Sequence, residues 1–422
     1  MPSLKPRRVV ITGLGLITPL GLDVPTTWRN LIAGKSGIGT IRGFDTSGFP
    51  CKVAGEIHHD AQQGFNPEHY VAAREVKKMG RFIHYGVAAA QEAVIDSGVN
   101  FAALEETGSI AGVCMGSGIG GLGNIEDAAQ DIALHRKQVS PFFIPSTLVN
   151  LLAGQVSIKY KLTGPNMALA TACTTGTHAL GEAAQIIIRG DADIMIAGSA
   201  ESSITPLGVK GFCACCALST NFNNDPTRAS RPWDKDRDGF VMSEGAGVVV
   251  LEEYEQAKKR GAKIYAEIAG YGLSGDGYHI TSPHPEGKGA RLCIERAIKS
   301  AHINYEDVNY VNAHGTSTQL GDKIELEVIQ NLFFEKNKSI LMSSTKSSLG
   351  HMLGAAGSVE LILCALSMRD SIVPPTINLD SPPVEAKIDL VPHTPINAQL
   401  NYVLSNSFGF GGTNASIVLK RV

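Results

Sequence analysis

Cys173 is the residue whose surroundings point most directly to chemistry. It follows a run of small apolar residues, 166–172, and it precedes an Ala-, Ile- and Leu-rich segment that extends to Arg189. This order predicts a strand that carries a thiol to the first turn of a helix. Because backbone N–H groups there are unpaired and the helix dipole is positive, the pKa of the thiol should fall and its nucleophilicity should rise. A lone cysteine is more often a small buried apolar residue, so the interpretation depends on other segments.

Two later segments each place a histidine among small, turn-forming residues. Residues 312–318 contain His314, and residues 344–351 contain Lys346 and His351. A cysteine nucleophile works beside groups that move protons or stabilise charge, and imidazole suits both tasks near neutral pH. The three segments together predict covalent catalysis by the cysteine.

Cys114 is a second candidate nucleophile. Residues 112–116 match a nucleophile elbow with cysteine in place of serine. Such an elbow needs a helix immediately after it, whereas residues 117–123 are interrupted by glycines. We therefore interpret Cys114 as a buried residue at the end of a strand.

The composition excludes several classes of protein. The chain has 422 residues, enough for two sizeable domains, and its net charge of −3 argues against a nucleic-acid partner. Its longest apolar runs are too short to span a bilayer, and its basic first residues lead into a strand pattern rather than a signal peptide. Eight cysteines are scattered, and the cluster at 213–216 lacks a second ligand pair at zinc-like spacing. We therefore expect no membrane association, no metal site and a reducing cytoplasm as the compartment.

The chain repeats itself loosely at half its length. Each half has a glycine-containing strand, an Ala-rich helical pattern, a buried strand that leads to a Gly/Ser/Thr loop, and a strand–turn–helix with a reactive residue. In that order the pairs are 9–15 with 266–272, 81–97 with 289–301, 112–118 with 310–316, and Cys173 with 346–351. Alternating strands and helices predict an α/β fold with two duplicated halves, residues 1–260 and 261–422, and a site at their junction.

Five motifs resemble those of the β-ketoacyl-[acyl-carrier-protein] synthases, and the elongating condensing enzymes of that family are the most similar. The motifs are residues 171–176, 231–240, 312–318, 344–357 and 406–414. The resemblance runs over nearly the whole chain and keeps the motif order. It implies the thiolase fold, with the two halves stacked in a five-layered α-β-α-β-α arrangement, and a homodimer.

The resemblance also implies a reaction. The enzyme would perform a decarboxylative Claisen condensation of acyl- and malonyl-carrier protein in type II fatty acid elongation. Cys173 would hold the acyl group, with an oxyanion hole from the N–H groups of Cys173 and Phe410. His314 and His351 would stabilise the enolate, and Lys346, paired with Glu360, would orient the site. Asp322, Glu325 and Phe408 would support these residues. No metal or organic cofactor is implied, because the acyl groups ride on the phosphopantetheine arm of the carrier.

The residue types separate branches of the superfamily. Thiolases carry a second cysteine in the C-terminal loop, which residues 406–414 lack, and initiating synthases have asparagine where His351 stands. Chain-length factors lack the active cysteine. A ketosynthase of a specialised polyketide pathway and a non-catalytic partner subunit remain alternatives.

The resemblance implies further roles around the site. Met115 and Phe212 would line the acyl pocket, Phe410 would gate it, and Asp276 and His279 would lie on a second mobile loop. An acidic carrier protein needs a basic docking patch. The candidate docking residues are Arg74, Lys77, Lys78 and Arg81, which recur at the spacing of one helix, and Arg136 and Lys137 in a polar segment. Cys216 stands where the family often has arginine, so that part of the patch stays open. Met115 stands where the family often has a branched aliphatic residue, so the chain-length preference stays open as well.

Overall fold

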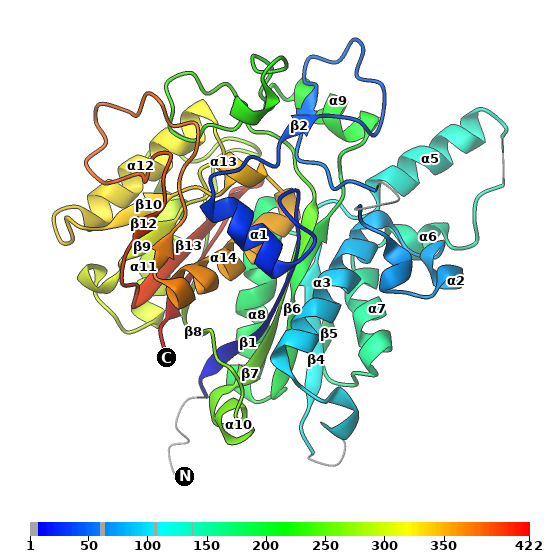
Figure 1. Ribbon diagram of the computed structural model, residues 1–422, viewed down its shortest axis with the longest axis horizontal. Coiled ribbons are helices and arrows are strands. Elements are labelled where there is room, and N and C mark those ends of the chain that lie inside the picture. The colour runs from blue at the N-terminus through cyan, green and yellow to red at the C-terminus, as the bar shows by residue number, and fades with distance from the viewer. Residues whose placement is uncertain (1–6, 60–63, 105–107, 137) are drawn as a thin grey trace.

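The computed structural model describes residues 7–59, 64–104, 108–136 and 138–422. Its centre is a ten-stranded mixed sheet in the order β10-β9-β13-β14-β8-β1-β7-β6-β4-β5 (Figure 1). The strands of the N-terminal half are β1 (Val9–Ile17), β4 (Ala111–Gly116), β5 (Asn166–Met167), β6 (Ile194–Glu201) and β7 (Gly245–Glu253). Those of the C-terminal half are β8 (Ala266–Gly275), β9 (Tyr310–Asn312), β10 (Leu341–Ser343), β13 (Tyr402–Gly409) and β14 (Thr413–Lys420). Two small sheets pair β2 (Gly39–Thr40) with β3 (Val53–Ala54), and β11 (Ile372–Val373) with β12 (Ile396–Asn397).

The two halves repeat the same strand order and the same strand directions. In the N-terminal half, β1 and β7 pair antiparallel, as do β7 and β6, whereas β6, β4 and β5 run parallel. In the C-terminal half, β8, β14 and β13 are antiparallel in turn, whereas β13, β9 and β10 run parallel. The halves join where β1 pairs with β8. The predicted duplication is therefore confirmed by the topology. The counterpart of the Cys173 turn is the 3-10 turn Leu353–Ala355 rather than residues 346–351, because each of these two turns directly precedes a long helix, 175–189 or 356–370.

The helices form the remaining layers. They are α1 (Val24–Ile32), α2 (Ala73–Val76), α3 (Arg81–Ser97), α5 (Leu122–Ala133), α6 (Phe143–Thr147), α7 (Leu151–Tyr160), α8 (Thr175–Arg189), α9 (Pro206–Ala214), α10 (Tyr254–Lys259), α11 (Lys288–Ser300), α12 (Gln319–Phe333), α13 (Lys346–Leu349) and α14 (Ala356–Asp370). Helices α8 and α14 pack against each other and against strands of both halves, so they form the middle layer. Helices α3 and α7 cover the outer face of the N-terminal strands, and α11 and α12 cover that of the C-terminal strands. The predicted five-layered α/β arrangement is confirmed.

The middle layer follows from the sequence of its helices. In α14 every residue from Ala356 to Met368 is buried, and most of α8 is buried as well. A helix that is apolar on all sides belongs in an interior, because no face of it gains from contact with water. The outer helix α11 instead has one buried face, which includes Cys293 and Ile294.

A Gly-x-Gly pair opens each half for a packing reason. A Cβ atom added to Gly13 on β1 would lie 2.1 Å from the carbonyl oxygen of Ala93 on α3. A Cβ atom added to Gly270 on β8 would lie 2.3 Å from the carbonyl oxygen of Ala297 on α11. The glycines therefore let an outer helix lie directly on its strand, at equivalent places in the two halves.

Within the described ranges, no helix combines the length and the apolar character that crossing a bilayer requires. The proposed division of the chain at residues 260 and 261 falls between α10 and β8. It stays a prediction, because the strands of both halves belong to one continuous sheet.

Candidate active site

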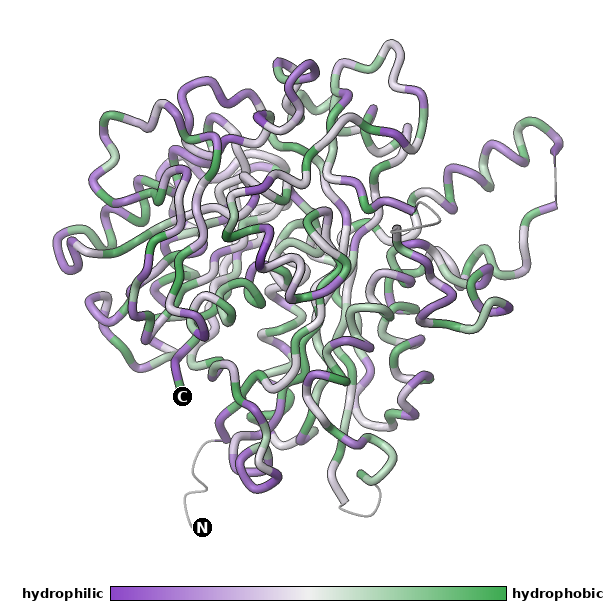
Figure 2. Tube along the Cα trace, in the orientation of Figure 1, coloured by the Kyte–Doolittle hydropathy of each residue, from purple (hydrophilic) through white to green (hydrophobic). Residues whose placement is uncertain are grey.

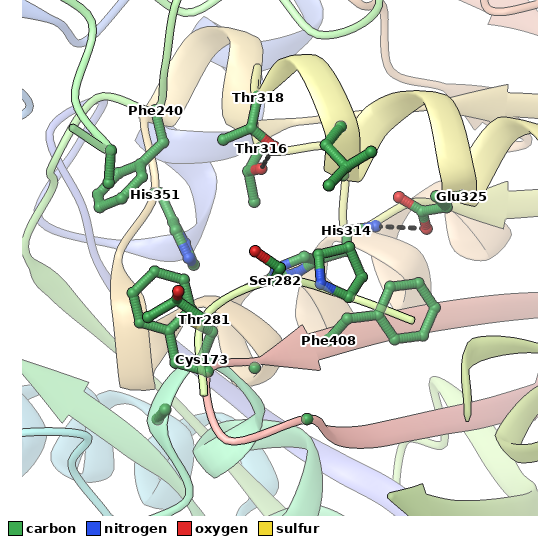
Figure 3. Close-up of a pocket in the computed structure, with 18 of the residues that line it drawn as sticks. Cys173, Phe240, Thr281, Ser282, His314, Thr316, Thr318, Glu325, His351 and Phe408 are labelled. Atoms are coloured by element: carbon green, nitrogen blue, oxygen red, sulfur yellow. Dashed lines mark hydrogen bonds between the residues drawn. The ribbon is translucent and has the colours of Figure 1, made fainter. Parts of the chain in front are cut away.

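A cavity of about 460 Å³ lies between the two halves, at the end where Cys173 is found. The N-terminal half contributes Cys173, Ile119 and Phe212, and the C-terminal half contributes His314 and His351 to its wall. Figure 3 shows both imidazole rings around the same space as the cysteine, with Phe408 beside His314. The structure thus brings together the three residues on which the prediction of covalent catalysis rested.

Cys173 lies in a single 3-10 turn, Ala172–Thr174, directly before α8. The preceding strand β5 has only two residues and ends at Met167, so the predicted strand into the cysteine is wrong for most of its length. Hydroxyl groups hold the turn instead: Thr174 Oγ1 donates to the Thr171 carbonyl at 2.6 Å, and Thr175 Oγ1 donates to the Ala172 carbonyl at 2.8 Å. The threonines around the cysteine are therefore local hydrogen-bond donors that fix the thiol.

The expected fall of the thiol pKa is also wrong. Burial raises the pKa of Cys173 to about 11, and the Glu201 carboxylate raises it further. The Lys346 ammonium group and the backbone N–H groups of Phe410 and Cys173 lower it, but they do not outweigh the burial. The Cys173 thiol is thus protonated near neutral pH, because the cavity withholds the water that would solvate a thiolate.

His314 and His351 form the opposite wall. Their ring centroids lie 5.3 Å apart and the ring planes are nearly perpendicular, at 86°. Burial lowers the pKa of both imidazoles well below the usual value, and the Lys346 ammonium group lowers both further. Each ring is therefore neutral near pH 7 and carries one N–H that can donate to an anionic oxygen. The Nδ1 atoms of both rings are buried and have no hydrogen-bond partner among the described residues.

Buried carboxylates hold the loop that carries His314. The N–H of His314 donates to Glu325 Oε1 at 2.9 Å, and the N–H of Gly315 donates to Glu325 Oε2 at 2.8 Å. Asp322 accepts from the N–H groups of Ser317 and Trp233 at 3.1 and 2.9 Å. Because α12 supplies both carboxylates, the start of that helix fixes the orientation of the histidine backbone.

Lys346 forms a buried ion pair with Glu360 on α14. Burial raises the pKa of Glu360 to about 6, and the Lys346 ammonium group opposes this shift. The Lys346 charge adds to the burial that keeps the two imidazoles neutral, and the Glu360 carboxylate anchors the ammonium group in place.

The C-terminal loop meets the second loop over the cavity. Asp276 accepts from Asn414 Nδ2 at 2.8 Å, and its own N–H donates to the Gly412 carbonyl at 2.8 Å. The ring of Phe408 lies 5.8 Å from that of His314, and Phe410 lines the cavity with 36% of its surface exposed.

His279 lies on the second loop, as predicted, but it does not line the cavity. Its Nδ1 accepts from the N–H groups of Thr281 and Ser282, both at 3.1 Å. Asp276 of the same loop lines the cavity, as do Thr281 and Ser282, whose side chains are drawn in Figure 3.

Met115 is not part of the cavity wall. It is fully buried on β4 in the apolar core with Ile196 and Val248, whereas Phe212 does line the cavity. Ile119, three residues beyond β4, lines the cavity in its place. The glycine-rich run around Ile119 was a signal that backbone approaches a site there, but the sequence did not show which side chain of the run faces inward. Cys114 is buried in the core, as interpreted from the sequence.

The predicted docking residues do not share one helix. Arg74 lies on α2, Lys77 and Lys78 follow it, and Arg81 starts α3 after a break at residues 79–80. The expected continuous helical spacing is therefore wrong, although Arg74, Lys77 and Arg81 are exposed. Lys78 is paired with Glu75 at 2.9 Å.

The remaining docking candidates lie elsewhere. Arg136 is exposed just after α5, and Lys137 lies outside the described residues. Cys216 is exposed after α9 and lines the mouth of the cavity together with Cys215. The carrier-docking role of these side chains stays a prediction.

Comparison with known proteins gives a consistent result. The sequence model of the family "Beta-ketoacyl synthase, N-terminal domain" matches residues 6–257, and that of "Beta-ketoacyl synthase, C-terminal domain" matches residues 265–380. The 3-oxoacyl-[acyl-carrier-protein] synthase 2 of Vibrio cholerae is 52% identical over 419 residues, which is 99% of both chains. The protein of the same name from Rhizobium meliloti is 51% identical over 418 residues, 98% of this chain and 99% of its own.

Solved structures agree in fold. A β-ketoacyl synthase from Burkholderia phymatum superposes with a TM-score of 0.89 at 32% identity, covering 99% of this chain and 100% of its own. A type II polyketide ketosynthase bound to its acyl-carrier protein has the same TM-score and identity over 99% of this chain and 100% of its own.

Proposed function

Because the chain belongs to the β-ketoacyl synthase family over nearly its whole length, we propose that it elongates fatty acids. It condenses acyl-carrier protein with malonyl-carrier protein and yields 3-oxoacyl-carrier protein, carbon dioxide and free carrier protein. The observation that carries the proposal is one cavity in which a cysteine faces two buried, neutral imidazoles beside a lysine–glutamate pair.

The first half-reaction moves the acyl group to Cys173. The thiol loses its proton as its sulfur attacks the thioester carbonyl, and the proton leaves with the carrier thiol. The Lys346 ammonium group and the N–H groups of Cys173 and Phe410 stabilise the thiolate character that develops. The same two N–H groups suit the oxyanion of the tetrahedral intermediate, because they converge on the sulfur.

The second half-reaction generates the carbanion. Malonyl-carrier protein loses carbon dioxide, and the enolate oxygen receives hydrogen bonds from the neutral rings of His314 and His351. The enolate carbon then attacks the acyl-Cys173 carbonyl and the thiolate leaves. The reaction needs no metal or organic cofactor in this scheme, because decarboxylation supplies the electron pair.

The carrier protein is the proposed partner in both half-reactions. The names of the relatives and the carrier-bound polyketide ketosynthase support this assignment. Exposed arginine and lysine side chains near α2 and α5 supply the positive charge that an acidic carrier would meet.

A second copy of the chain is the other proposed partner. Strand β5 is an edge of the sheet, and apolar residues are exposed along the chain from Ile110, just before β4, to Met167 on β5. They are Ile110, Ile125, Ile132, Ile144, Leu148, Ile158 and Met167. Helix α5 projects from the molecule and alternates between apolar and polar residues (Figure 2). Such a face favours a homodimer, since a monomer would leave it against water. The cytoplasm is the proposed compartment, because all eight cysteines are free thiols.

Fatty acid elongation is favoured over polyketide synthesis by degree of similarity. The fatty acid enzymes are 52% and 51% identical to the chain, whereas the carrier-bound polyketide ketosynthase is 32% identical. The reactive cysteine argues against a non-catalytic subunit.

The function is tested by incubating the enzyme with acyl- and malonyl-carrier protein and measuring the masses of the carrier products by mass spectrometry. One 3-oxoacyl-carrier protein that is two carbons longer than the acyl donor is expected. Repeated extension of the unreduced chain would instead identify a polyketide ketosynthase.

A further inference from the structure

Glu201, the last residue of β6, is a buried carboxylate that the proposed mechanism does not use. It has 0% exposure. Its Oε2 accepts from the backbone N–H groups of Gly118 at 2.8 Å and Gly354 at 3.1 Å. Its Oε1 accepts from the hydroxyl groups of Ser117 at 3.0 Å and Ser203 at 2.9 Å. Four donors therefore converge on one side chain.

The two backbone donors come from different halves of the molecule. Gly118 belongs to the loop after β4, and Gly354 belongs to the 3-10 turn Leu353–Ala355 before α14. A Cβ atom on Gly354 would lie 2.2 Å from the nitrogen of Gly118, and one on Gly118 would lie 2.8 Å from Glu201 Oε2. The two chain segments are thus in direct backbone contact, and the carboxylate joins them.

Both joined segments form part of the cavity wall. Ile119 follows Gly118, Leu353 precedes Gly354, and both side chains line the cavity that contains Cys173. The turn that carries Cys173 packs against the turn that carries Gly354. The carboxylate is also close enough to the sulfur to raise the pKa of Cys173. A shift of this junction would therefore move the wall of the acyl site.

A carboxylate suits this place for a physical reason. Buried backbone N–H groups without an acceptor destabilise a fold, and a single acceptor oxygen serves both of these. Burial raises the pKa of Glu201, and the hydrogen bonds from Ser203, Ser117, Gly118 and Gly354 lower it. The group is held by donors on every side rather than by an opposite charge.

We propose that Glu201 is a positioning residue that ties the Gly118 loop to the Gly354 turn and so fixes the width of the acyl-binding part of the cavity. The inference rests on the proposed function, because it assigns this wall to the fatty acyl chain. Long acyl groups, which extend furthest along the wall, depend on the junction more than an acetyl group does.

Two substitutions separate the joining role from the charge. Glu201→Gln keeps an oxygen for both backbone donors, and its amide group can donate to the two serine hydroxyls. Glu201→Ala leaves all four donors without this acceptor. The matched control is Glu92→Ala, because Glu92 on α3 also accepts from two backbone N–H groups, those of Leu16 and Val24, but does not line the cavity.

The test is single-turnover acylation of Cys173 by acetyl-carrier protein and by a long-chain acyl-carrier protein. A misplacement of about 1 Å can cost about 10²-fold in rate, so Glu201→Ala should lose about 10²-fold with the long chain and clearly less with acetyl. Glu201→Gln should recover most of this loss, and Glu92→Ala should leave the ratio of the two rates unchanged. Equal losses with both chain lengths, or a glutamine variant as impaired as the alanine variant, would overturn the proposal.

A second pair of variants applies if Glu201→Ala does not fold. Gly118→Ala places a methyl group against the junction, whereas Gly123→Ala on α5 meets only an ordinary contact of 3.5 Å. Loss of long-chain acylation by Gly118→Ala alone supports the proposal, and equal behaviour of the two variants overturns it. A parent enzyme that fails to acylate Cys173 at all would contradict the proposed function instead, so the two failures are distinguishable.

Discussion

The turn that carries Cys173 and its counterpart in the C-terminal half have the same backbone and opposite tasks. Each is a 3-10 turn before a middle-layer helix, and each begins with a residue in the left-handed region, Ala172 at φ 49° and Leu353 at φ 49°. The strand end beside the second turn carries Glu201, whose carboxylate engages the N–H of Gly354. The equivalent strand end in the C-terminal half is Gly409, where even a Cβ atom would lie only 3.3 Å from the nitrogen of Cys173.

This difference shows how a duplicated scaffold can divide its work. In the C-terminal half, the Glu201 carboxylate of the N-terminal half accepts from the N–H of Gly354, so the Leu353–Ala355 turn is structural. At the Cys173 turn of the N-terminal half, Gly409 from the C-terminal half has no side chain, so the N–H of Cys173 can face substrate. The loops after β4 and β9 divide in the opposite sense: the first holds Gly118 at the junction, and the second carries His314. Of these four segments, each half thus supplies one reactive and one supporting segment.

The division predicts that the two half-reactions can be separated. Replacing His314 or His351 with alanine removes a donor to the enolate, which typically costs on the order of 10²–10³ in rate. Malonyl-carrier decarboxylation should fall by that amount, whereas acylation of Cys173 should suffer less, because its turn belongs to the other half. Carbon dioxide release and acyl-enzyme formation are measured on the same preparations. Normal decarboxylation by both variants would break the assignment.

The electrostatic contrast between the two walls gives a pH prediction. Because the pKa of the Cys173 thiol is raised, its thiolate fraction grows as pH rises. The rate of alkylation of Cys173 by iodoacetamide should therefore increase about tenfold per pH unit through the neutral range. The increase should continue toward pH 11, because burial raises the pKa of the thiol to about 11. Peptide mass spectrometry must follow Cys173 itself, because Cys215 and Cys216 are exposed. A plateau below about pH 8.5, the pKa of an ordinary cysteine, would contradict this account.

Ile119 in the loop after β4 and Met115 on β4 should differ in effect: the first should control chain-length preference and the second stability. Ile119→Phe adds volume at the cavity wall, so acylation with long chains should fall more than acylation with short ones. Met115→Phe overpacks the core, which typically costs about 1–3 kcal/mol of stability, and it should leave the chain-length preference unchanged. Thermal unfolding and single-turnover acylation distinguish the two effects. A selective loss of long chains in Met115→Phe would restore Met115 to the pocket.

The smallest expected effect concerns carrier docking at the surface of the N-terminal half. Reversing the charges of Arg74 and Lys77 should raise the apparent KM for carrier-bound substrate, and more so at low salt, because exposed charges are less screened there. Lys258 and Lys259 on α10, away from α2 in Figure 1, provide the matched control reversal. Equal kinetics for the two double variants across salt concentrations would remove the patch near α2 from the docking surface.

The sequence predicted those parts of the molecule that local patterns determine. Short repeated patterns predicted the two halves and the helix after Cys173. Small, turn-forming residues marked the segments of Cys173, His314 and His351. The pKa of Cys173 was predicted in the wrong direction, since a helix start is local whereas burial depends on how both halves close over the thiol.

Long-range junctions were not predictable in the same way. Glu201 meets Gly118 across 83 residues and Gly354 across 153 residues, so no motif contains the three together. The prediction of one helix through the docking residues failed for the opposite reason: their spacing fitted one helix, but Met79 and Gly80 interrupt it, and Met79 is buried in the core.

Cys173 in the turn before α8, and no other cysteine of the chain, should carry the acyl group during catalysis. Intact-mass analysis of the enzyme after incubation with acyl-carrier protein, followed by peptide mapping, tests it directly. We expect one acyl adduct per chain on Cys173, its absence in Cys173→Ala, and its persistence in Cys114→Ala, where the replaced thiol lies in the core. An adduct on Cys114, or condensation that continues in Cys173→Ala, would contradict it.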